Sequence, residues 1–296
     1  MRIFVTGATG NIGSAVVKDL LAAGHRVIGL SRSREKAEIL AASGAEVCFG
    51  TLDDLEGLQT VAASADAVIH LAFNHDFSRF KANCEDDRAV IKALAQGLAG
   101  SSRPLVVTSG TPIANSIPGQ PAREGNPIIS SDQHPRAATE EAAQAAAALG
   151  GNVSVVRLPQ VHDQYSQGLI TPAIGMFRAQ GECVYVGDGQ NRWPAAHRLD
   201  VARLYRLAVE RAEPNAKYHA VAEEGVAMRA ITETIAARLD LPVRSVTPDE
   251  APTVFGWLAM FAGLDMPASS EQTRRILDWH PSGPSLLDDL KQLVVL

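Results

Sequence analysis

The feature that most constrains this chain is a glycine-rich turn from Gly7 to Gly13, directly after a short apolar run. Arg2–Thr6 is predicted to be a β-strand, and Ile12–Ala23 has the apolar spacing of a helix. Glycines at such a junction allow a tight turn, close approach of a pyrophosphate and close packing of helix on strand. The free N–H groups and positive dipole end of the helix then attract phosphate. The turn predicts a dinucleotide-binding unit, and a turn that serves chain reversal alone is the less favoured alternative.

The rest of the first half repeats this alternation. Five more short apolar runs are expected to be strands: Arg26–Leu30, Glu46–Phe49, Ala67–Leu71, Leu105–Ser109 and Val153–Leu158. Helical patterns separate or follow them: Ser33–Ser43, Leu55–Ala63, Ala82–Ala99 and Pro135–Leu149. Continuous apolar strands alternating with helices predict an α/β fold of Rossmann type, in which a doubly wound parallel sheet has helices on both faces.

After Leu158 the alternation becomes looser. Helices are expected at Val201–Arg211, Met228–Leu239 and Ser285–Leu293, and this region is interpreted as a smaller lobe over the end of the sheet. We predict a nucleotide-binding domain over residues 1–158 and a mainly substrate-binding lobe over residues 159–296, with a diffuse and interleaved boundary. The segment Thr111–His134 is rich in Pro, Gly, Ser and Asn and is predicted to be a long loop, a kind of segment that is often functional.

Composition argues against several function classes. The 296 residues carry a net charge of −6 without a basic block, so nucleic acid is not expected as a partner. No apolar run approaches about 20 residues, and the N-terminus lacks the pattern of a signal peptide, so no membrane association is expected. Cys48, Cys84 and Cys183 have no CxxC spacing and the histidines no ligand spacing. We therefore expect no disulfide and no metal, and a reducing cytoplasm fits best.

The end of the second predicted strand indicates which dinucleotide binds. NAD-binding proteins usually place an acidic residue here to accept the ribose 2′-hydroxyl. This chain has Ser31 and Arg32 instead. A guanidinium beside a hydroxyl suits a 2′-phosphate, so NADP is the expected cofactor and NAD the alternative. The competing interpretation is that Arg32 and Arg34 are solvated charges at the start of a helix.

Several motifs in order resemble those of short-chain dehydrogenase/reductases of the extended or atypical, epimerase/dehydratase-like kind, over nearly the whole chain. They are Thr6–Gly13 (TGxxGxxG), Gly50–Asp54, Val68–Ala72, Leu105–Ser109, Arg157–His162, His197–Ala202 and Leu277–Pro281. With the glycine turn, the resemblance implies a set of cofactor contacts at the sheet edge: Gly7, Thr9, Gly10, Asn11, Ile12, Gly13, Ser31, Arg32, Leu52, Leu71, Ala72, Ser109 and Pro159.

The helix that should carry the family's Tyr-x-x-x-Lys motif departs from that pattern. Residues 130–141 read SSDQHPRAATEE, and none of the four tyrosines has a lysine four positions later. In the family the tyrosine exchanges a proton with the substrate oxygen, while the lysine lowers the tyrosine pKa and holds the nicotinamide ribose. The resemblance therefore implies a member that keeps the cofactor site and lacks the usual catalytic pair.

Other side chains are candidates for the missing chemistry. Ser109 could hydrogen-bond a substrate carbonyl, with Thr111 as its rival, or its hydroxyl could simply bond its own backbone. His134, before the helix, and His162, on the loop after the sixth strand, are candidate acids because histidine titrates near neutral pH; a plain loop position is the alternative for each. Arg136 is hypothesised to replace part of the lysine's ribose contact.

Four further features receive mainly structural interpretations. Asp200 is expected to cap the following helix, and Trp279 to anchor the last helix to the core. The run Phe255–Phe261 is expected to pack in a core, with the lining of a substrate pocket as the alternative. The small-residue face of Ala142–Ala148 would permit the homodimer that is common in the family.

Three functions follow from these observations. The leading hypothesis is an NADP-dependent oxidoreductase that acts on a small carbonyl or alcohol with non-standard acid–base residues. The second is a non-catalytic NADP(H)-binding sensor, which the absent tyrosine and lysine motivate. The third is a nucleotide-sugar epimerase or dehydratase, which ranks last because that class usually keeps the tyrosine.

Overall fold

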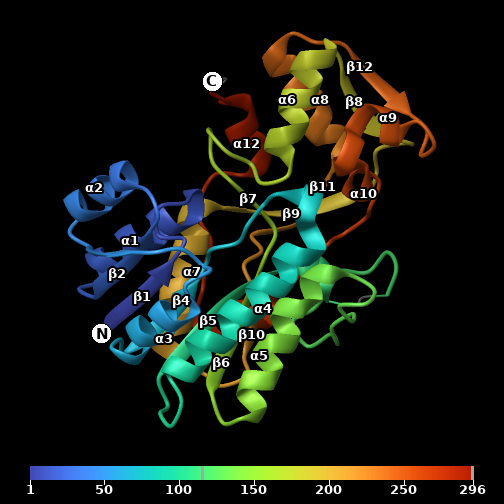
Figure 1. The fold of residues 1–296 in the computed structure, drawn as a ribbon. Coiled ribbons are helices and arrows are strands. Elements are labelled where there is room, and N and C mark those ends of the chain that lie inside the picture. Colours follow the sequence, from blue (N-terminus) through green and yellow to red (C-terminus); the bar gives the residue numbers. More distant parts are fainter. Residues whose placement is uncertain (115–116, 295–296) are drawn as a thin grey trace.

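The computed structural model describes residues 1–114 and 117–294, and its centre is a seven-stranded parallel sheet (Figure 1). The strand order is β10-β6-β5-β4-β1-β2-β3, which confirms the predicted doubly wound fold. Because the order reverses beside β1, the carboxyl ends of β1 and β4 lie at the switch point where such folds bind ligands. The strands are β1 (Arg2–Thr6), β2 (Arg26–Ser31), β3 (Glu46–Phe49), β4 (Ala67–His70), β5 (Pro104–Gly110), β6 (Asn152–Leu158) and β10 (Lys217–His219).

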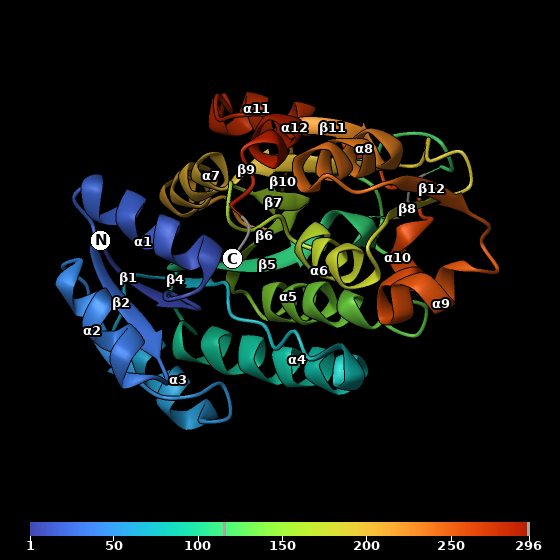
Figure 2. The same cartoon turned by 90° about the horizontal axis from the view of Figure 1, so that it is seen from above.

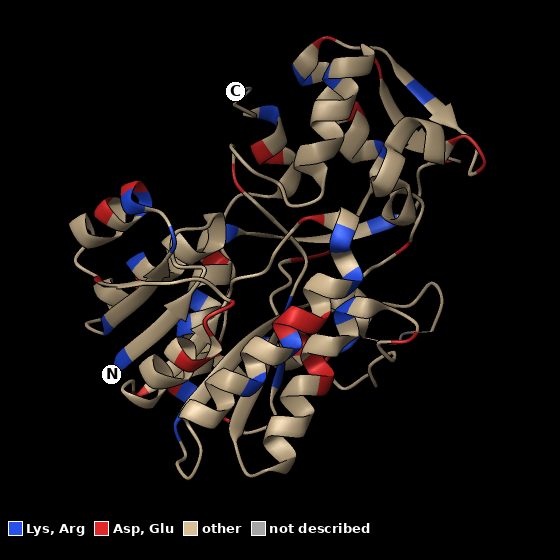
Figure 3. Cartoon of the chain, viewed as in Figure 1, with Lys and Arg blue, Asp and Glu red and all other residues tan. Residues whose placement is uncertain are grey.

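Helices cover both faces of this sheet (Figure 2). One layer consists of α3 (Leu55–Ala63), α4 (Phe80–Gly97) and α5 (Ala138–Ala148), and the other contains α1 (Asn11–Ala22), α2 (Arg34–Ala42) and α7 (Arg198–Arg211). Charged side chains of both signs are interspersed along these elements (Figure 3), and Arg88 on α4 pairs with Glu141 on α5 at 2.7 Å.

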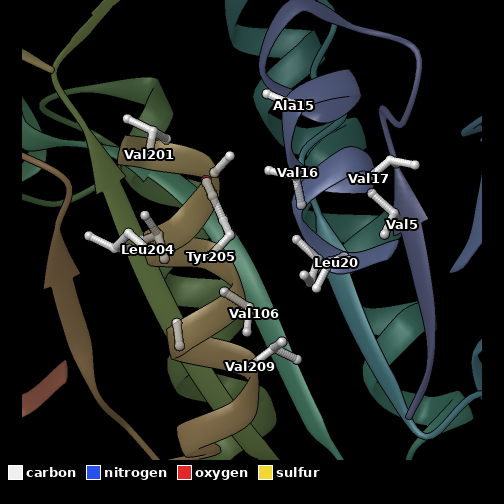
Figure 4. Packing of buried hydrophobic residues seen from close by; sticks show 14 of the residues in the cluster. Val5, Ala15, Val16, Val17, Leu20, Val106, Val201, Leu204, Tyr205 and Val209 are labelled. Carbon is white, nitrogen blue, oxygen red and sulfur yellow. The ribbon is translucent and has the colours of Figure 1, made fainter. Parts of the chain in front are cut away.

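Alternate residues of each strand enter two separate cores. Val5 and Val106 face α1 and α7, where they meet Val16, Leu20 and Val209 (Figure 4). The intervening strand residues Phe4, Leu105 and Val107 face α3, α4 and α5. Burial on both faces is the reason that the strands are unbroken apolar runs in the sequence.

A smaller lobe stands above the sheet domain (Figure 1). It contains α6 (Ile170–Gln180), β8 (Cys183–Val186), α8 (Met228–Leu239), β12 (Val243–Val246), α9 (Ala251–Phe255), η4 (Gly256–Leu258), α10 (Ala259–Ala262) and α12 (Leu286–Lys291). Its own core includes the buried rings of Phe177, Trp193 and Phe255. A three-stranded sheet lies between the lobe and the large sheet, in the order β11 (Glu223–Ala227), β9 (Arg192–His197) and β7 (Gln160–His162).

The chain returns to the sheet domain after it has entered the lobe. Helix α7 and strand β10 belong to the sheet domain, although they lie within residues 159–296, the range predicted to be mainly lobe with an interleaved boundary. Helix α11 (Glu271–Leu277) also returns, and the fully buried Trp279 after it donates its indole N–H to the Asp200 carbonyl at 2.9 Å.

The prediction that Asp200 caps α7 is wrong. The His197 side chain accepts the N–H of Leu199 at this helix start. The carboxylate of Asp200 instead accepts the N–H groups of Ser282 and Gly283. Asp200 therefore fixes a distant loop, which its position next to a helical run does not reveal.

The segment predicted as a long loop is anchored on the domain it borders. It begins with η2 (Thr111–Ile113), pairs Ala122 with Ala268, and ends at η3 (Pro135–Ala137); residues 115–116 lie outside the described part. The buried Glu124 carboxylate accepts both the backbone N–H and the hydroxyl of Thr273, at 2.8 and 2.7 Å.

Part of the small-residue face of α5 packs against other helices of the same chain. Ala142, Ala143 and Ala146 are buried in the core with α3 and α4. Ala145 and Ala148 are exposed, so a homodimer through α5 would use these residues and stays a prediction.

Over residues 1–114 and 117–294, no helix is both long and apolar enough to cross a membrane. The same residues include no group of three or more His, Cys, Asp and Glu side chains placed to hold a metal ion. All three cysteines are described and free.

Candidate cofactor site and active site

The glycine turn between β1 and α1 has the geometry that its sequence predicts. Gly7 has φ of +70°, a conformation that other residues rarely adopt, and its carbonyl accepts the N–H of Gly10 at 2.9 Å. A Cβ atom on Gly13 would stand 1.9 Å from the Gly7 carbonyl oxygen, and one on Gly7 would stand 2.8 Å from the Ala72 nitrogen. The glycines are thus required for the tight turn and for the contact with the end of β4.

The start of α1 offers free hydrogen-bond donors. The first turn closes when Ser14 N–H binds the Gly10 carbonyl at 2.9 Å, and within the described residues the N–H groups of Asn11, Ile12 and Gly13 have no partner. Thr9, half-buried, lies in the same turn. Unpaired N–H groups at the positive end of a helix dipole are what a pyrophosphate needs. The residues present therefore fit a dinucleotide.

The side chain of Asn11 ties this turn to the start of α7. Its carbonyl oxygen accepts from Arg198 at 2.8 Å, and Arg198 also pairs with Asp163, just after β7, at 3.0 Å. The anchor comes from β7 and α7, two elements far apart in the sequence, and the glycine pattern contains no signal of it.

At the end of β2 the two residues predicted to meet a 2′-phosphate differ in their availability. Arg32 is exposed, and so is Arg34; neither side chain has an ion pair or hydrogen bond within the described residues. Ser31 is buried and already donates its hydroxyl hydrogen to the Ser33 carbonyl at 3.0 Å. Arg32 is free to bind an anion, whereas Ser31 would have to give up this bond to donate to a phosphate.

The other predicted cofactor residues lie at the same edge of the sheet. The backbone N–H groups of Leu71 and Ala72 bind the Thr6 carbonyl and hydroxyl oxygens, both at 3.3 Å, which joins the ends of β1 and β4. Leu52 and Pro159 are half-buried and follow β3 and β6. Carboxyl ends of parallel strands share one edge, so these predicted residues lie on the same side of the sheet as the glycine turn.

A buried polar chain runs from the glycine turn to α5. The Thr6 hydroxyl bonds His70 Nδ1 at 2.7 Å, and His70 Nε2 bonds Asp87 Oδ1 at 2.9 Å. Asp87 Oδ2 pairs with Arg136 at 2.7 Å and also accepts the hydroxyl of Thr139. Each link is made between different elements, so only the folded chain assembles the set.

The Arg136 guanidinium has contacts with several other side chains and with the backbone. Besides Asp87 it donates to the Thr108 carbonyl at 2.9 Å and to the Thr139 hydroxyl, and its guanidinium carbon stands 4.0 Å from the centre of the Phe73 ring. Burial would raise the pKa of Asp87, but the Arg136 charge and the His70 hydrogen bond outweigh it and hold that pKa well below its usual range. A charged pair therefore fixes Arg136 near the start of α5.

Ser109 is buried near the carboxyl end of β5. Its hydroxyl has no hydrogen-bond partner within the described residues. Its neighbour Thr108 points the other way and shares its hydroxyl with the His70 carbonyl and Tyr205, both at 2.7 Å. An unpaired buried hydroxyl costs about 1–3 kcal/mol, so its partner is expected to be a ligand. Thr111, the rival, is buried at the start of η2.

His134 lies beside Arg136. Its Nδ1 accepts the backbone N–H of Arg136 at 3.3 Å, and its ring meets the Phe80 ring edge-on with centres 5.9 Å apart. Burial, and then the Arg136 charge, lower the pKa of His134. The ring is thus neutral at pH 7 and carries its hydrogen on Nε2, which makes it a hydrogen-bond donor.

The structure does not bring His162 to this group. It is fully buried on β7, its Nδ1 bonds Asp289 of α12 at 2.7 Å, and its ring meets that of His197. Burial lowers the pKa of His162 in spite of its hydrogen bond to the Asp289 carboxylate. No described contact joins it to Ser109 or Arg136, because β7 leaves the large sheet and pairs with β9. Sequence order suggested a proximity that the sheet topology does not provide.

Sequence reasoning missed Thr6, His70, Asp87 and Thr139 as members of the site. A signal was present for two of them. His70 interrupts an apolar strand, and Asp87 falls on the apolar face of α4 between Cys84 and Val90. A charged or polar residue on a buried face is rare unless it is paired, so both positions indicate an internal network.

The run Phe255–Phe261 has two faces. Phe255, Leu258 and Phe261 are buried in the lobe core, as expected. Trp257 and Met260 remain 39% and 56% exposed, and Trp257 stacks on Phe77 of η1 (Phe77–Arg79) in the sheet domain.

A family comparison agrees with this geometry. The model of the NAD dependent epimerase/dehydratase family matches residues 3–222. An uncharacterized protein of Schizosaccharomyces pombe is 42% identical, and the match covers 98% of each chain. The sterol-4-alpha-carboxylate 3-dehydrogenase, decarboxylating, of Dictyostelium discoideum is 24% identical over 77% of this chain and 73% of its own.

A solved structure has the same fold. DesIV, a dTDP-glucose 4,6-dehydratase from Streptomyces venezuelae with NAD and TYD bound, superimposes with a TM-score of 0.79. The alignment covers 99% of this chain and 95% of that one at 22% identity.

Proposed function

This chain belongs to the NAD-dependent epimerase/dehydratase family, and we propose that it is an NADP(H)-dependent oxidoreductase of a small carbonyl or alcohol. The observation that carries the proposal is the buried Ser109 hydroxyl, which has no partner among the described residues. It lies one residue beyond Thr108, whose carbonyl binds Arg136, and Arg136 in turn adjoins His134. The name of the Dictyostelium relative, a dehydrogenase, supports the reaction class.

The glycine turn and Arg32 would hold the cofactor, the first through backbone N–H groups and the second through its free guanidinium. When bound, the nicotinamide supplies or accepts the hydride of such a reaction. Arg32 at the position of the usual acidic residue favours the 2′-phosphate of NADP over the 2′-hydroxyl of NAD.

Arg136 would take the ribose contact that the family's lysine makes. Its Nε has no partner within the described residues, whereas the other two nitrogens are bound to Asp87, Thr139 and Thr108. Arginine remains charged at any pH that a folded protein meets, so this contact would not titrate. The network fixes the side chain before the cofactor arrives, which reduces the entropic cost of binding.

Ser109 and His134 would together replace the missing tyrosine, which in the family binds the substrate oxygen and exchanges its proton. The Ser109 hydroxyl would orient the substrate carbonyl, and the neutral His134 ring would donate its Nε2 hydrogen to the oxygen as negative charge develops there. Tyr205 does not suit this role. Its ring is fully buried, its hydroxyl is bonded to Thr108, and burial raises its pKa above the ordinary value.

The experiment is NADPH consumption measured with a panel of aldehydes and ketones. Ser109→Ala should lower kcat/KM at least about tenfold, the value of one hydrogen bond. His134→Asn keeps an acceptor for the Arg136 N–H and removes the Nε2 donor, so it should lower kcat by about a hundredfold. Leu149→Ala, an exposed change at the far end of α5, is the control.

A non-catalytic NADP(H) sensor is the second candidate, since two of the three Arg136 nitrogens are already engaged and the nearby Tyr205 is fully buried and bonded to Thr108. It predicts tight NADPH binding without consumption by any member of the panel. Turnover that Ser109→Ala and His134→Asn both reduce would exclude it. Binding of a nucleotide-sugar by protein that retains its cofactor tightly would instead support the epimerase or dehydratase alternative.

A further inference from the structure

A row of aromatic rings follows β4. Phe73 and Phe80 meet edge-on with ring centres 6.4 Å apart, and Phe77 and Phe80 lie 5.4 Å apart. The three rings are only half-buried. Phe77 packs against the lobe core, whereas Phe73 and Phe80 belong to none of the apolar cores of the described residues. A contiguous set of partly exposed aromatic rings is a feature of binding surfaces, so the exposed parts of these rings are available to a ligand.

One end of the row reaches the lobe. Phe77 stacks on Trp257 with centres 4.2 Å apart and planes 12° apart, and Phe261 stands edge-on to Phe77 at 6.4 Å. The ribbon views agree with this contact, because the first turn of α4 points to α10 (Figures 1 and 2). The exposed Met260 extends the apolar surface on α10.

The other end of the row reaches the groups proposed to react. Phe73 lies 4.0 Å from the guanidinium carbon of Arg136, and Phe80 touches the ring of His134. A molecule whose carbonyl meets Ser109 and His134 would therefore have its remaining atoms beside Phe73, Phe80 and Phe77.

The chemistry of this surface discriminates between substrates. A diphosphate would need cationic side chains, whereas the row itself consists of rings; Arg79 and Lys81 beside it are exposed. Three lobe arginines, Arg192, Arg229 and Arg244, are already paired with Asp265, Glu233 and Glu182. Flat rings gain stacking or edge-to-face contacts on such a surface that puckered rings of the same size do not.

We propose that the aromatic row (Phe73, Phe77, Phe80 and Trp257) recognises the substrate, and that the substrate is a carbonyl compound with a flat aromatic ring. The inference rests on the proposed oxidoreductase function and names its substrate class. In the reaction the carbonyl carbon gains a hydride from NADPH and the oxygen gains a proton from the enzyme, so an aldehyde becomes a primary alcohol and NADPH becomes NADP+.

The first test measures binding without turnover. Of the three tryptophans, Trp193 and Trp279 are buried to 1% and 0% exposure, so quenching of fluorescence by acrylamide reports mainly on Trp257. Hydrocinnamaldehyde added to the protein with NADP+ should protect Trp257 from the quencher. Its cyclohexyl analogue and UDP-glucose should protect it much less. Trp257→Phe should abolish the change in signal.

The second test measures selectivity in turnover. Hydrocinnamaldehyde and its cyclohexyl analogue carry the same unconjugated carbonyl, so a difference in kcat/KM reports on the ring alone. Phe77→Leu should reduce the preference for the aromatic aldehyde by about three- to tenfold, the worth of one aromatic contact. Leu149→Ala, remote from the row, should leave that preference unchanged.

The outcomes separate this inference from the proposed function. Turnover of both aldehydes at equal kcat/KM, without protection of Trp257, would overturn the aromatic substrate class and leave the oxidoreductase intact. Protection of Trp257 by UDP-glucose alone would overturn it in favour of a nucleotide-sugar. Protection of Trp257 by the aromatic aldehyde without turnover would support recognition of aromatic ligands by the row and contradict the proposed oxidoreductase function.

Discussion

The turn at the start of α1 and the segment before α5 serve the same ligand edge but are built in opposite ways. The turn is made of neighbouring residues, and its key contacts are backbone to backbone, such as Gly10 N–H to the Gly7 carbonyl. The start of α5 is made of side chains from four elements, joined through Asp87 to Arg136, His70 and Thr139. A local turn can therefore be recognised as a sequence motif, whereas a network of side chains from separate elements has no fixed spacing in the sequence.

The largest effect is expected from breaking the network at its centre. Asp87→Asn leaves the Arg136 charge unpaired in a buried site, and breaking such a pair costs about 3–5 kcal/mol of stability. Denaturant unfolding should show this loss, together with weaker NADPH binding. Asp86→Asn, the exposed neighbour on α4, is the control. A change below about 1 kcal/mol, the usual range for an exposed pair, would mean that the network is solvent-screened.

The same carboxylate predicts a dependence on pH. The pKa of Asp87 is lowered in the folded chain, so its contribution is present above the unfolded pKa of about 3.9 and is lost as the pH falls through the folded value. The difference in unfolding free energy between wild type and Asp87→Asn should hold constant at neutral pH and shrink below about pH 4. A difference that grows on acidification would contradict the assignment of a charged Asp87.

A side chain at Gly13 should disrupt the glycine turn through a steric clash. In Gly13→Ala the new Cβ would stand 1.9 Å from the Gly7 carbonyl oxygen, so the backbone must move. We expect a loss of about 1–3 kcal/mol in stability and an NADPH affinity at least about tenfold weaker. Gly175→Ala, inside α6 where a Cβ meets open space, should be neutral or slightly stabilising. Unchanged NADPH titrations of Gly13→Ala would refute the close contact.

Cofactor choice should depend on a single side chain. Arg32→Ala removes one charge-assisted contact to a 2′-phosphate, worth about 1.5–3 kcal/mol, so NADPH should bind about ten- to a hundredfold more weakly. NADH affinity should stay the same. Arg26→Ala, at the other end of β2 and paired with Glu46, is the matched control. Equal losses for NADPH and NADH would remove Arg32 from the site.

The smallest effect concerns stability at Ser109. Its hydroxyl is buried without a described partner, so Ser109→Ala removes no bond in the free protein. The melting temperature should be unchanged or slightly raised, and the free energy of unfolding should rise by at most about 1 kcal/mol, even though turnover falls. A clear loss of stability would show that the hydroxyl has a structural partner.

The fold was largely predictable because most of its signals are local. Apolar runs such as Leu105–Ser109 correspond to strands buried on both faces, and positive-φ glycines such as Gly24 and Gly44 end the first two helices. The lobe was less predictable. Its strands β8 and β12 pair only with each other and lie outside the strand–helix alternation that indicated the equally short β3 and β4.

The sequence by itself determined the βαβ unit, the glycine turn and the absence of the Tyr-x-x-x-Lys pair, because each depends on residues within one or two elements. Only the tertiary structure decided which other residues join the site. It brought Arg136, Asp87 and His70 together from η3, α4 and β4, and it placed His162 on β7, which pairs with β9 outside the large sheet. The physical reason is that a buried charge must find its partner in space, and sheet topology, not sequence distance, determines which side chains are near enough to provide it.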